Sequence, residues 1–297
     1  MRENRDYLNS LHPVCPLIYF ALMTGVSMMN LYPAYLVCAL VSSFGYAVYL
    51  KGFRKQLKVL SFAVPAAVVA IIINSLFNHR GVTTLFYLPD GNPFTLESVY
   101  YGLNFSLMLV SVITQFSCFN VIATSDKTVC LLGGIMPSLA LFISMVLRFV
   151  PKLSSHINDV NRYRNSSFSN EKNNLKTKIS SALSVFSSTV SWAFESSVTT
   201  SDSMRSRGSS GRRSAMSIYK FAKREIVFTL FLIIFGAASL IPVFTKNTQV
   251  NYYPEAYISP FNAINITGTA CFFIFCMLPM IFNLTEEIKW RISLSRI

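Results

Sequence analysis

Long apolar stretches separated by short polar turns dominate this sequence. Six of them run for 16 to 24 residues with almost no charge, close to the length that a helix needs to cross about 30 Å of hydrocarbon. In chain order they are residues 14–29, 31–50, 59–77, 99–122, 226–244 and 261–282. This pattern predicts an all-α, polytopic membrane protein with about six spanning helices.

The interval between the fourth and fifth stretches does not follow the pattern. Residues 136–150 are apolar, but this run is only 15 residues long and already contains Arg148, which suits a helix at the membrane surface better than a span. We expect the helix to continue past Pro151 and to end near Arg164. A polar turn follows at residues 166–174.

A second long helix is predicted over residues 176–207, with Gly208 directly after it at the expected position of a C-terminal cap. Apolar side chains recur there every three or four positions and form a stripe along one face: Ile179, Leu183, Phe186, Val190 and Phe194. Ten serines between positions 180 and 203 make the rest of the helix too polar for lipid. The pattern leaves open whether the stripe faces another protein or packs against the chain's own preceding helix.

Charge supports a membrane topology with both termini in the cytoplasm. The net charge is +13, and only 13% of the residues are charged. With cytoplasmic ends, the three external segments contain only Arg80 and Lys246 among all 26 Lys and Arg residues, as the positive-inside rule requires. This rule explains the excess charge, so no nucleic-acid partner is expected. The predicted segments are membrane helices over 1–134, cytoplasmic helices over 135–220 and membrane helices over 221–297.

Motifs for chemistry are missing from the sequence. There is no phosphate-binding GxxxxGK[ST] loop, no HExxH zinc motif and no GxSxG nucleophile elbow. The six cysteines form no CxxC pair, and the three histidines are far apart. We therefore expect no catalytic residue, metal site or cofactor. A lipid-modifying enzyme would have to use Asp126, His156 and Asp159, the candidates nearest the predicted membrane surface.

Two further alternatives concern transport and membrane attachment. A stand-alone secondary transporter or channel fits poorly, because such proteins usually carry an ionisable residue at depth, and the predicted spans have none in mid-span. The segment 148–225 carries 14 Lys or Arg against 5 Asp or Glu, so it could also serve only as a basic patch attracted to anionic lipid.

Several motifs resemble the transmembrane T component of energy-coupling factor (ECF) transporters, a group that includes the cobalt permease-like proteins. The run Met-Arg-Ser-Arg-Gly at 204–208 resembles the family's second Ala-Arg-Gly signature, with Ser206 in place of alanine. Leu-Arg-Phe-Val-Pro at 147–151 resembles the start of its first coupling helix. The first signature departs from the family pattern, since Tyr-Arg-Asn stands at 163–165. The similarity extends from about residue 12 to residue 219.

The resemblance implies a subunit without chemistry of its own. In this family, two cytoplasmic ABC-type ATPases hydrolyse ATP, a small membrane subunit binds a vitamin or a transition-metal ion, and the T component links them in the plasma membrane of bacteria or archaea. The resemblance assigns ATPase docking to Arg164, Arg205, Ser206, Arg207 and Gly208. It assigns the interface with the substrate-binding subunit to the stripe Ile179, Leu183, Phe186, Val190 and Phe194.

Overall fold

The computed structural model describes residues 7–87, 93–167, 175–208, 223–245, 248, 250–253, 257–258 and 262–294. They form two compact units. The first unit combines Met1–Thr124 with Tyr219–Ile297, and the second is Ser125–Ile218. Packing therefore joins the helices from the two ends of the chain, whereas the predicted segments divide the chain by its expected topology.

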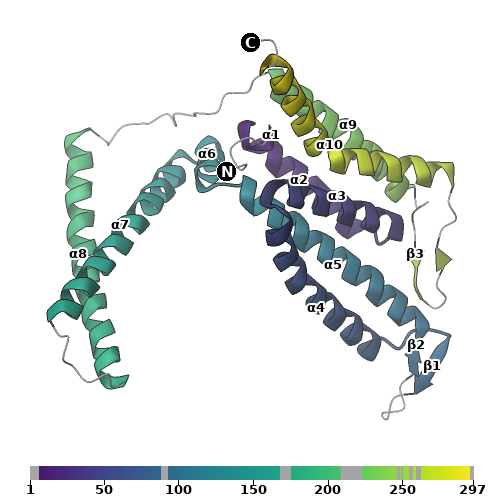
Figure 1. Cartoon of the computed structure of the whole chain (residues 1–297), viewed down its shortest axis with the longest axis horizontal. Helices are drawn as coiled ribbons and strands as arrows, with labels where there is room; N and C mark the ends of the chain where they lie inside the picture. Colours follow the sequence, from purple (N-terminus) through teal and green to yellow (C-terminus); the bar gives the residue numbers. More distant parts are fainter. Residues whose placement is uncertain are drawn as a thin grey trace. The chain divides into compact units, whose positions relative to one another are not determined.

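The first unit contains seven of the described helices and two short hairpins. In chain order they are α1 (Tyr7–Ser10), α2 (Val14–Met29), α3 (Pro33–Lys51), α4 (Phe53–Phe77), β1 (Thr84–Tyr87), β2 (Pro93–Thr95), α5 (Leu96–Ile122), α9 (Lys223–Phe244), β3 (Val250–Asn251), β4 (Tyr257–Ile258) and α10 (Ala263–Leu294). Within this unit α5 packs on α2, α3 and α4, while α10 packs on α3 and α9 (Figure 1).

Six described helices are long and apolar enough to cross a membrane, so the fold is all-α and polytopic. Five of them, α3, α4, α5, α9 and α10, match predicted spans. The remaining predicted span, α2, has 16 residues and a length of about 24 Å. The sixth helix that is long and apolar enough to cross a membrane is Pro137–Arg164. The sequence predicts a helix at the membrane surface for this segment.

The outward faces of the spanning helices are those of a lipid-embedded bundle. In α4, Val68 and Ile72 are about half exposed, and only 17% of its most apolar window is buried. Contiguous exposed apolar surface on this scale is rare in soluble monomers and normal in lipid.

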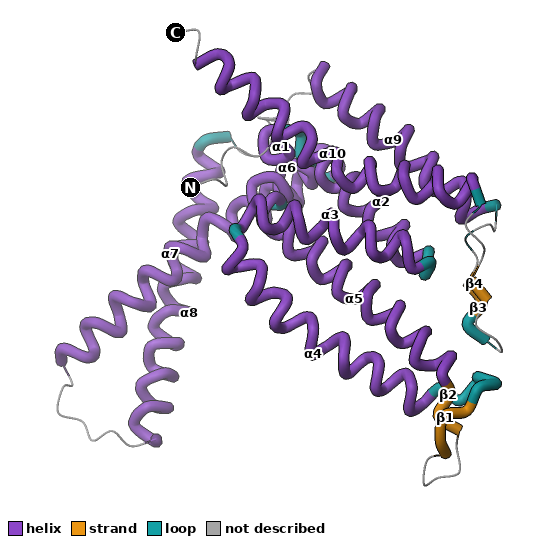
Figure 2. Tube along the Cα trace, turned by 45° about the vertical axis from the view of Figure 1, so that its right-hand side comes forward, coloured by secondary structure: helices purple, strands orange, loops and turns teal. Residues whose placement is uncertain are grey.

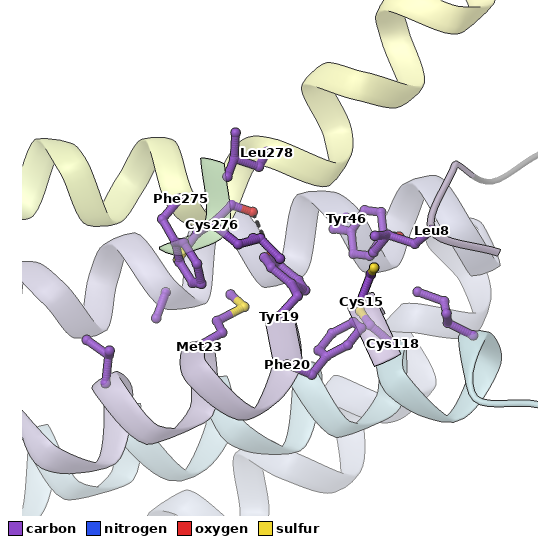
Figure 3. Close-up of a cluster of buried hydrophobic side chains, with 14 of the residues drawn as sticks. Leu8, Cys15, Tyr19, Phe20, Met23, Tyr46, Cys118, Phe275, Cys276 and Leu278 are labelled. Carbon is purple, nitrogen blue, oxygen red and sulfur yellow. Dashed lines mark hydrogen bonds between the residues drawn. The ribbon is translucent and has the colours of Figure 1, made fainter. Parts of the chain in front are cut away.

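The core of the first unit is aromatic, and the hydroxyls of its buried Tyr19 and Tyr35 are hydrogen-bonded to backbone carbonyls. Tyr19 of α2 is fully buried against α10, and its hydroxyl donates to the Cys276 carbonyl of α10 at 2.8 Å (Figure 3). The Tyr35 ring stacks on Phe272, with centroids 5.2 Å apart. A buried tyrosine needs such an acceptor because an unpaired hydroxyl in an apolar medium costs several kcal/mol, on the order of 4–8.

Tyrosines and the β1–β2 hairpin cover the C-terminal end of α4 and the N-terminal end of α5. Few basic residues lie at these ends. Tyr253 accepts a hydrogen bond from the Asn78 amide at 2.7 Å. Tyr252 donates to the Leu31 carbonyl at 2.9 Å. Burial, with a smaller effect of the neighbouring Tyr101, raises the pKa of Tyr252 to about 12, so this hydroxyl remains a donor throughout the physiological pH range.

The second unit consists of α6 (Ser125–Ile135), α7 (Pro137–Ser167) and α8 (Leu175–Ser206). The two long helices are those that the sequence predicts between the fourth and fifth apolar stretches. Pro137 occupies the first position of α7, where its missing N–H is no loss, and Pro151 lies within α7, so the helix continues past it as predicted.

Candidate functional site

The residues assigned to partner docking all lie on α7 and α8, which pack against each other within the second unit. Val185 and Thr189 are the most buried side chains of α8, at 8% and 6% exposed. The Thr189 hydroxyl donates to the Val185 carbonyl one turn earlier, at 2.7 Å, so this polar group is satisfied within its own helix. At these two positions the side chains that α8 turns towards α7 are therefore small, and the polar group of Thr189 is satisfied.

An aromatic stack joins the two helices near their middle. The Trp192 indole of α8 stacks on the His156 imidazole of α7, with ring centroids 4.3 Å apart and planes 9° from parallel. Phe149, also on α7, lies 5.9 Å from the same indole. His156, a candidate for enzymatic chemistry in the sequence, therefore has its ring engaged in a packing contact, and its Nε2 is buried without a hydrogen-bond partner.

A groove of about 400 Å³ lies beside this stack, between α7 and α8. Its walls are mostly apolar, with Asn161 and Thr189 as the polar side chains. The other lining residues are Leu153, Ile157, Ala182, Val185, Phe186, Val190 and Ala193. The groove offers no cluster of acid, base and nucleophile that would indicate catalysis.

Arg164 forms a hydrogen bond within the second unit. Its Nη1 donates to the Ser181 carbonyl of α8 at 3.2 Å, and the side chain is half-buried. A charged donor to a backbone carbonyl is a comparatively strong hydrogen bond. Arg164 thus links the end of α7 to α8, a structural role that the sequence did not predict.

The end of α8 presents its arginines to the surroundings. Arg205, Ser206, Arg207 and Gly208 are all exposed. Gly208 has φ of +73°, and its N–H donates to the Arg205 carbonyl at 2.9 Å. This is the left-handed C-terminal cap that glycine favours, and the sequence predicts it at this position. Ser206 is occupied locally, since its hydroxyl donates to the carbonyls of Asp202 and Ser203.

The apolar stripe of α8 faces outward within the described residues. Four of its five side chains are 60–71% exposed: Ile179, Leu183, Phe186 and Phe194. The fifth, Val190, is half-buried. Phe186 and Val190 also border the groove on α7. Within this unit, α7 contacts the face of α8 next to the stripe, and Ile179, Leu183 and Phe194 do not line the groove.

A buried carboxylate in the first unit has no counterpart in the sequence analysis. Glu97, 4% exposed, lies in the first turn of α5, and its Oε1 accepts from the Thr83 amide at 3.1 Å and from the Thr83 hydroxyl at 2.7 Å. A side chain at Gly81 would fall on the Glu97 carboxylate and on Thr95. The acidic residue two positions after Pro-Phe-Thr, in the first turn of a helix, was the available signal.

Among the described residues, no three His, Cys, Asp or Glu side chains lie together as metal ligands. The chain matches no protein-family model and no curated protein.

Proposed function

We propose that this chain is the energy-coupling transmembrane subunit of an ECF-type ABC importer. It would link two cytoplasmic ATPases to a separate membrane subunit that binds a vitamin or a transition-metal ion. It would perform no chemistry itself, and ATP hydrolysis would occur in the partners.

The observation that carries the proposal is the free, arginine-bearing end of α8. Arg205 and Arg207 are exposed where the helix stops at a glycine cap. A guanidinium presents a planar fork of donors that matches a carboxylate on a partner, and a glycine cap fixes the direction in which the chain leaves the helix. Such an end suits insertion into a groove of a cytoplasmic protein.

The stripe on the same helix supports a second contact. Ile179, Leu183 and Phe194 form exposed apolar surface on a helix otherwise rich in serine. A large apolar face on an amphipathic helix indicates a protein or membrane contact. One stiff helix would then carry both contacts, so a movement imposed at its arginine end would be transmitted to the stripe as a rigid-body shift.

Arg164 and Arg207 have different roles in this proposal. Arg207 is the main docking residue. Arg164, bonded to the Ser181 carbonyl, holds α7 against α8 and so fixes the angle at which the docking end is presented. Its remaining donors are compatible with an additional contact to a partner, because a guanidinium has five N–H groups.

Topology is part of the same proposal. With both termini in the cytoplasm of a bacterial or archaeal cell, the second unit lies on the side of the ATPases. The charge distribution supports this arrangement, because the segment 148–225 holds 14 of the 26 Lys and Arg residues.

Affinity purification of the chain from its native membrane, in mild detergent, tests the proposal. We expect two ABC-type ATPases and one small polytopic membrane protein to co-purify, and mass spectrometry of the small molecule released from that complex identifies its cargo. Transport by the purified chain alone in proteoliposomes, without ATP, would instead establish the alternative of a secondary transporter or channel.

A further inference from the structure

The β1–β2 hairpin carries an exposed apolar surface that the proposed function does not use. In β1, Leu85, Phe86 and Tyr87 are 57%, 55% and 69% exposed. Val82, just before the strand, is 61% exposed. Because neighbouring residues of a strand point to opposite faces, both faces of this hairpin present apolar side chains.

A hairpin of this kind is poorly suited to water. Its two strands pair Phe86 with Phe94, whose rings stack with centroids 4.6 Å apart. Two-stranded hairpins are at best marginally stable in isolation. An exposed apolar edge strand also invites aggregation. The side chains of β1 therefore need a covering surface that the described chain does not supply.

The position of the hairpin points to lipid. It joins the end of α4 to the start of α5, two helices long and apolar enough to span a bilayer. In Figures 1 and 2 it turns away from the line of α5, towards the side of the unit formed by α4 and away from α2, α3 and α10. α4 itself exposes apolar side chains, among them Val68 and Ile72, as a lipid-facing helix does.

Dimensions and charge agree with this position. A four-residue strand is about 13 Å long, whereas the headgroup layer is only about 5–7 Å thick in each leaflet. A hairpin that continued straight along α5 would carry Tyr87 into water, but a hairpin turned sideways keeps it at headgroup depth. The described residues 81–87 and 93–96 contain no Asp, Glu, Lys or Arg, so the two strands themselves bring no charge to the interface. The charged residues of this segment are Arg80 before it, Glu97 after it and Asp90 in the turn, which lies outside the described residues.

We propose that the β1–β2 hairpin is a membrane-interface anchor whose Leu85, Phe86 and Tyr87 side chains insert between lipid headgroups and the upper acyl chains. Aromatic side chains are enriched at this depth because they combine an apolar ring with polarity at the ring edge or hydroxyl. Phe77, the last residue of α4, is also exposed. This inference does not depend on the identity of the protein's partners.

Tryptophan fluorescence in defined vesicles tests the anchor. Tyr87→Trp is introduced together with Trp192→Phe and Trp290→Phe, so that the new indole is the only one in the chain. The variant is reconstituted into phosphatidylcholine vesicles that contain lipid brominated either near the headgroup or near the acyl-chain end. Leu85→Trp in the same background provides a second probe if the first variant does not accumulate.

We expect blue-shifted emission that loses most of its intensity with bromine near the headgroup, less with bromine at the chain end, and little with aqueous iodide. Adding Leu85→Asp to the Tyr87→Trp variant should shift the emission to the red and reduce quenching by bromolipid, because a carboxylate resists insertion. Red emission quenched by iodide would overturn the proposal in favour of a solvated hairpin. Emission quenched by neither agent would also overturn it, because the hairpin would then be buried against a second copy or another protein.

Discussion

Gly268 of α10 lies where three helices of the first unit meet. An added Cβ would fall on the Pro242 ring of α9 and come within 2.6 Å of the Tyr35 hydroxyl of α3. That hydroxyl donates to the Ser239 carbonyl at 3.3 Å, so it cannot move aside without losing its acceptor. Glycine is required here for close packing, as small residues commonly are between membrane helices.

Gly268→Ala should therefore destabilise the bundle by about 1–3 kcal/mol, the usual cost of overpacking. Gly25→Ala is the matched control, because a Cβ at Gly25, in α2, would meet nothing within 4 Å. Thermal unfolding in mild detergent should show a lower midpoint for the first variant and an unchanged or higher one for the second. Equal midpoints would contradict the close approach.

The Trp192 stack makes a corresponding prediction for the second unit. Trp192→Ala removes an indole from between Phe149 and His156 and should weaken the contact of α7 with α8 by about 2–4 kcal/mol. Phe194→Ala, at a 71% exposed neighbour, should leave that contact unchanged. Hydrogen exchange of the α8 amides measures the difference, and similar exchange in the two variants would argue against the stack as the main link.

At the scale of elements, α5 shows how a spanning helix can bury polar side chains. Its buried face includes Ser111, Thr114 and Gln115, which the uncharged predicted span over 99–122 did not suggest. The Gln115 amide accepts from the Thr24 hydroxyl at 3.0 Å and donates to Ser27 at 3.3 Å. These bonds connect α5 with α2, and α2 is the shortest of the apolar helices in the predicted set.

Gln115→Ala should cost about 1 kcal/mol, since hydrogen bonds between membrane helices average about 0.6 kcal/mol each. The neighbouring Phe116 is 51% exposed, so Phe116→Ala should have little effect. Unfolding of both variants in the same detergent provides the comparison. A loss confined to Phe116→Ala would reverse our assignment of the buried face.

Helix positions were predictable from the sequence because apolar length and cap residues are local signals. Five of the predicted spans are helices at the predicted positions, and Gly208 caps α8 as predicted. Contacts between helices were not predictable, since the Arg164 bond to Ser181 and the Trp192 stack depend on how α7 and α8 are aligned. Glu97 was missed for the same reason: its partner, Thr83, belongs to a different segment.

At the scale of the whole molecule, α7 decides the topology. Leu139, Phe142, Val146 and Val150 are exposed along its first half, and Pro137–Arg164 has the composition of a span. A single additional crossing would move the basic second unit to the outside and reverse the charge asymmetry. For the second unit to reach cytoplasmic ATPases, α7 must lie on the membrane surface or in a cytoplasmic contact.

Reporter fusions after Lys178 test this topology. A fluorescent protein that folds only in the cytoplasm should be bright there, and alkaline phosphatase should be inactive. A fusion after Tyr87, in the β1–β2 hairpin, should give the opposite pair of results. Active phosphatase after Lys178 would mean that α7 crosses the membrane.

The most direct test of the coupling role is charge reversal at the end of α8. Arg207→Glu should abolish most ATPase co-purification and leave the detergent-solubilised chain folded, because breaking a buried charge pair at an interface costs about 2–5 kcal/mol. Lys178→Glu reverses an exposed charge near the other end of the same helix and should retain the ATPases. Recovery of the full set of partners with Arg207→Glu at wild-type yield would contradict the account.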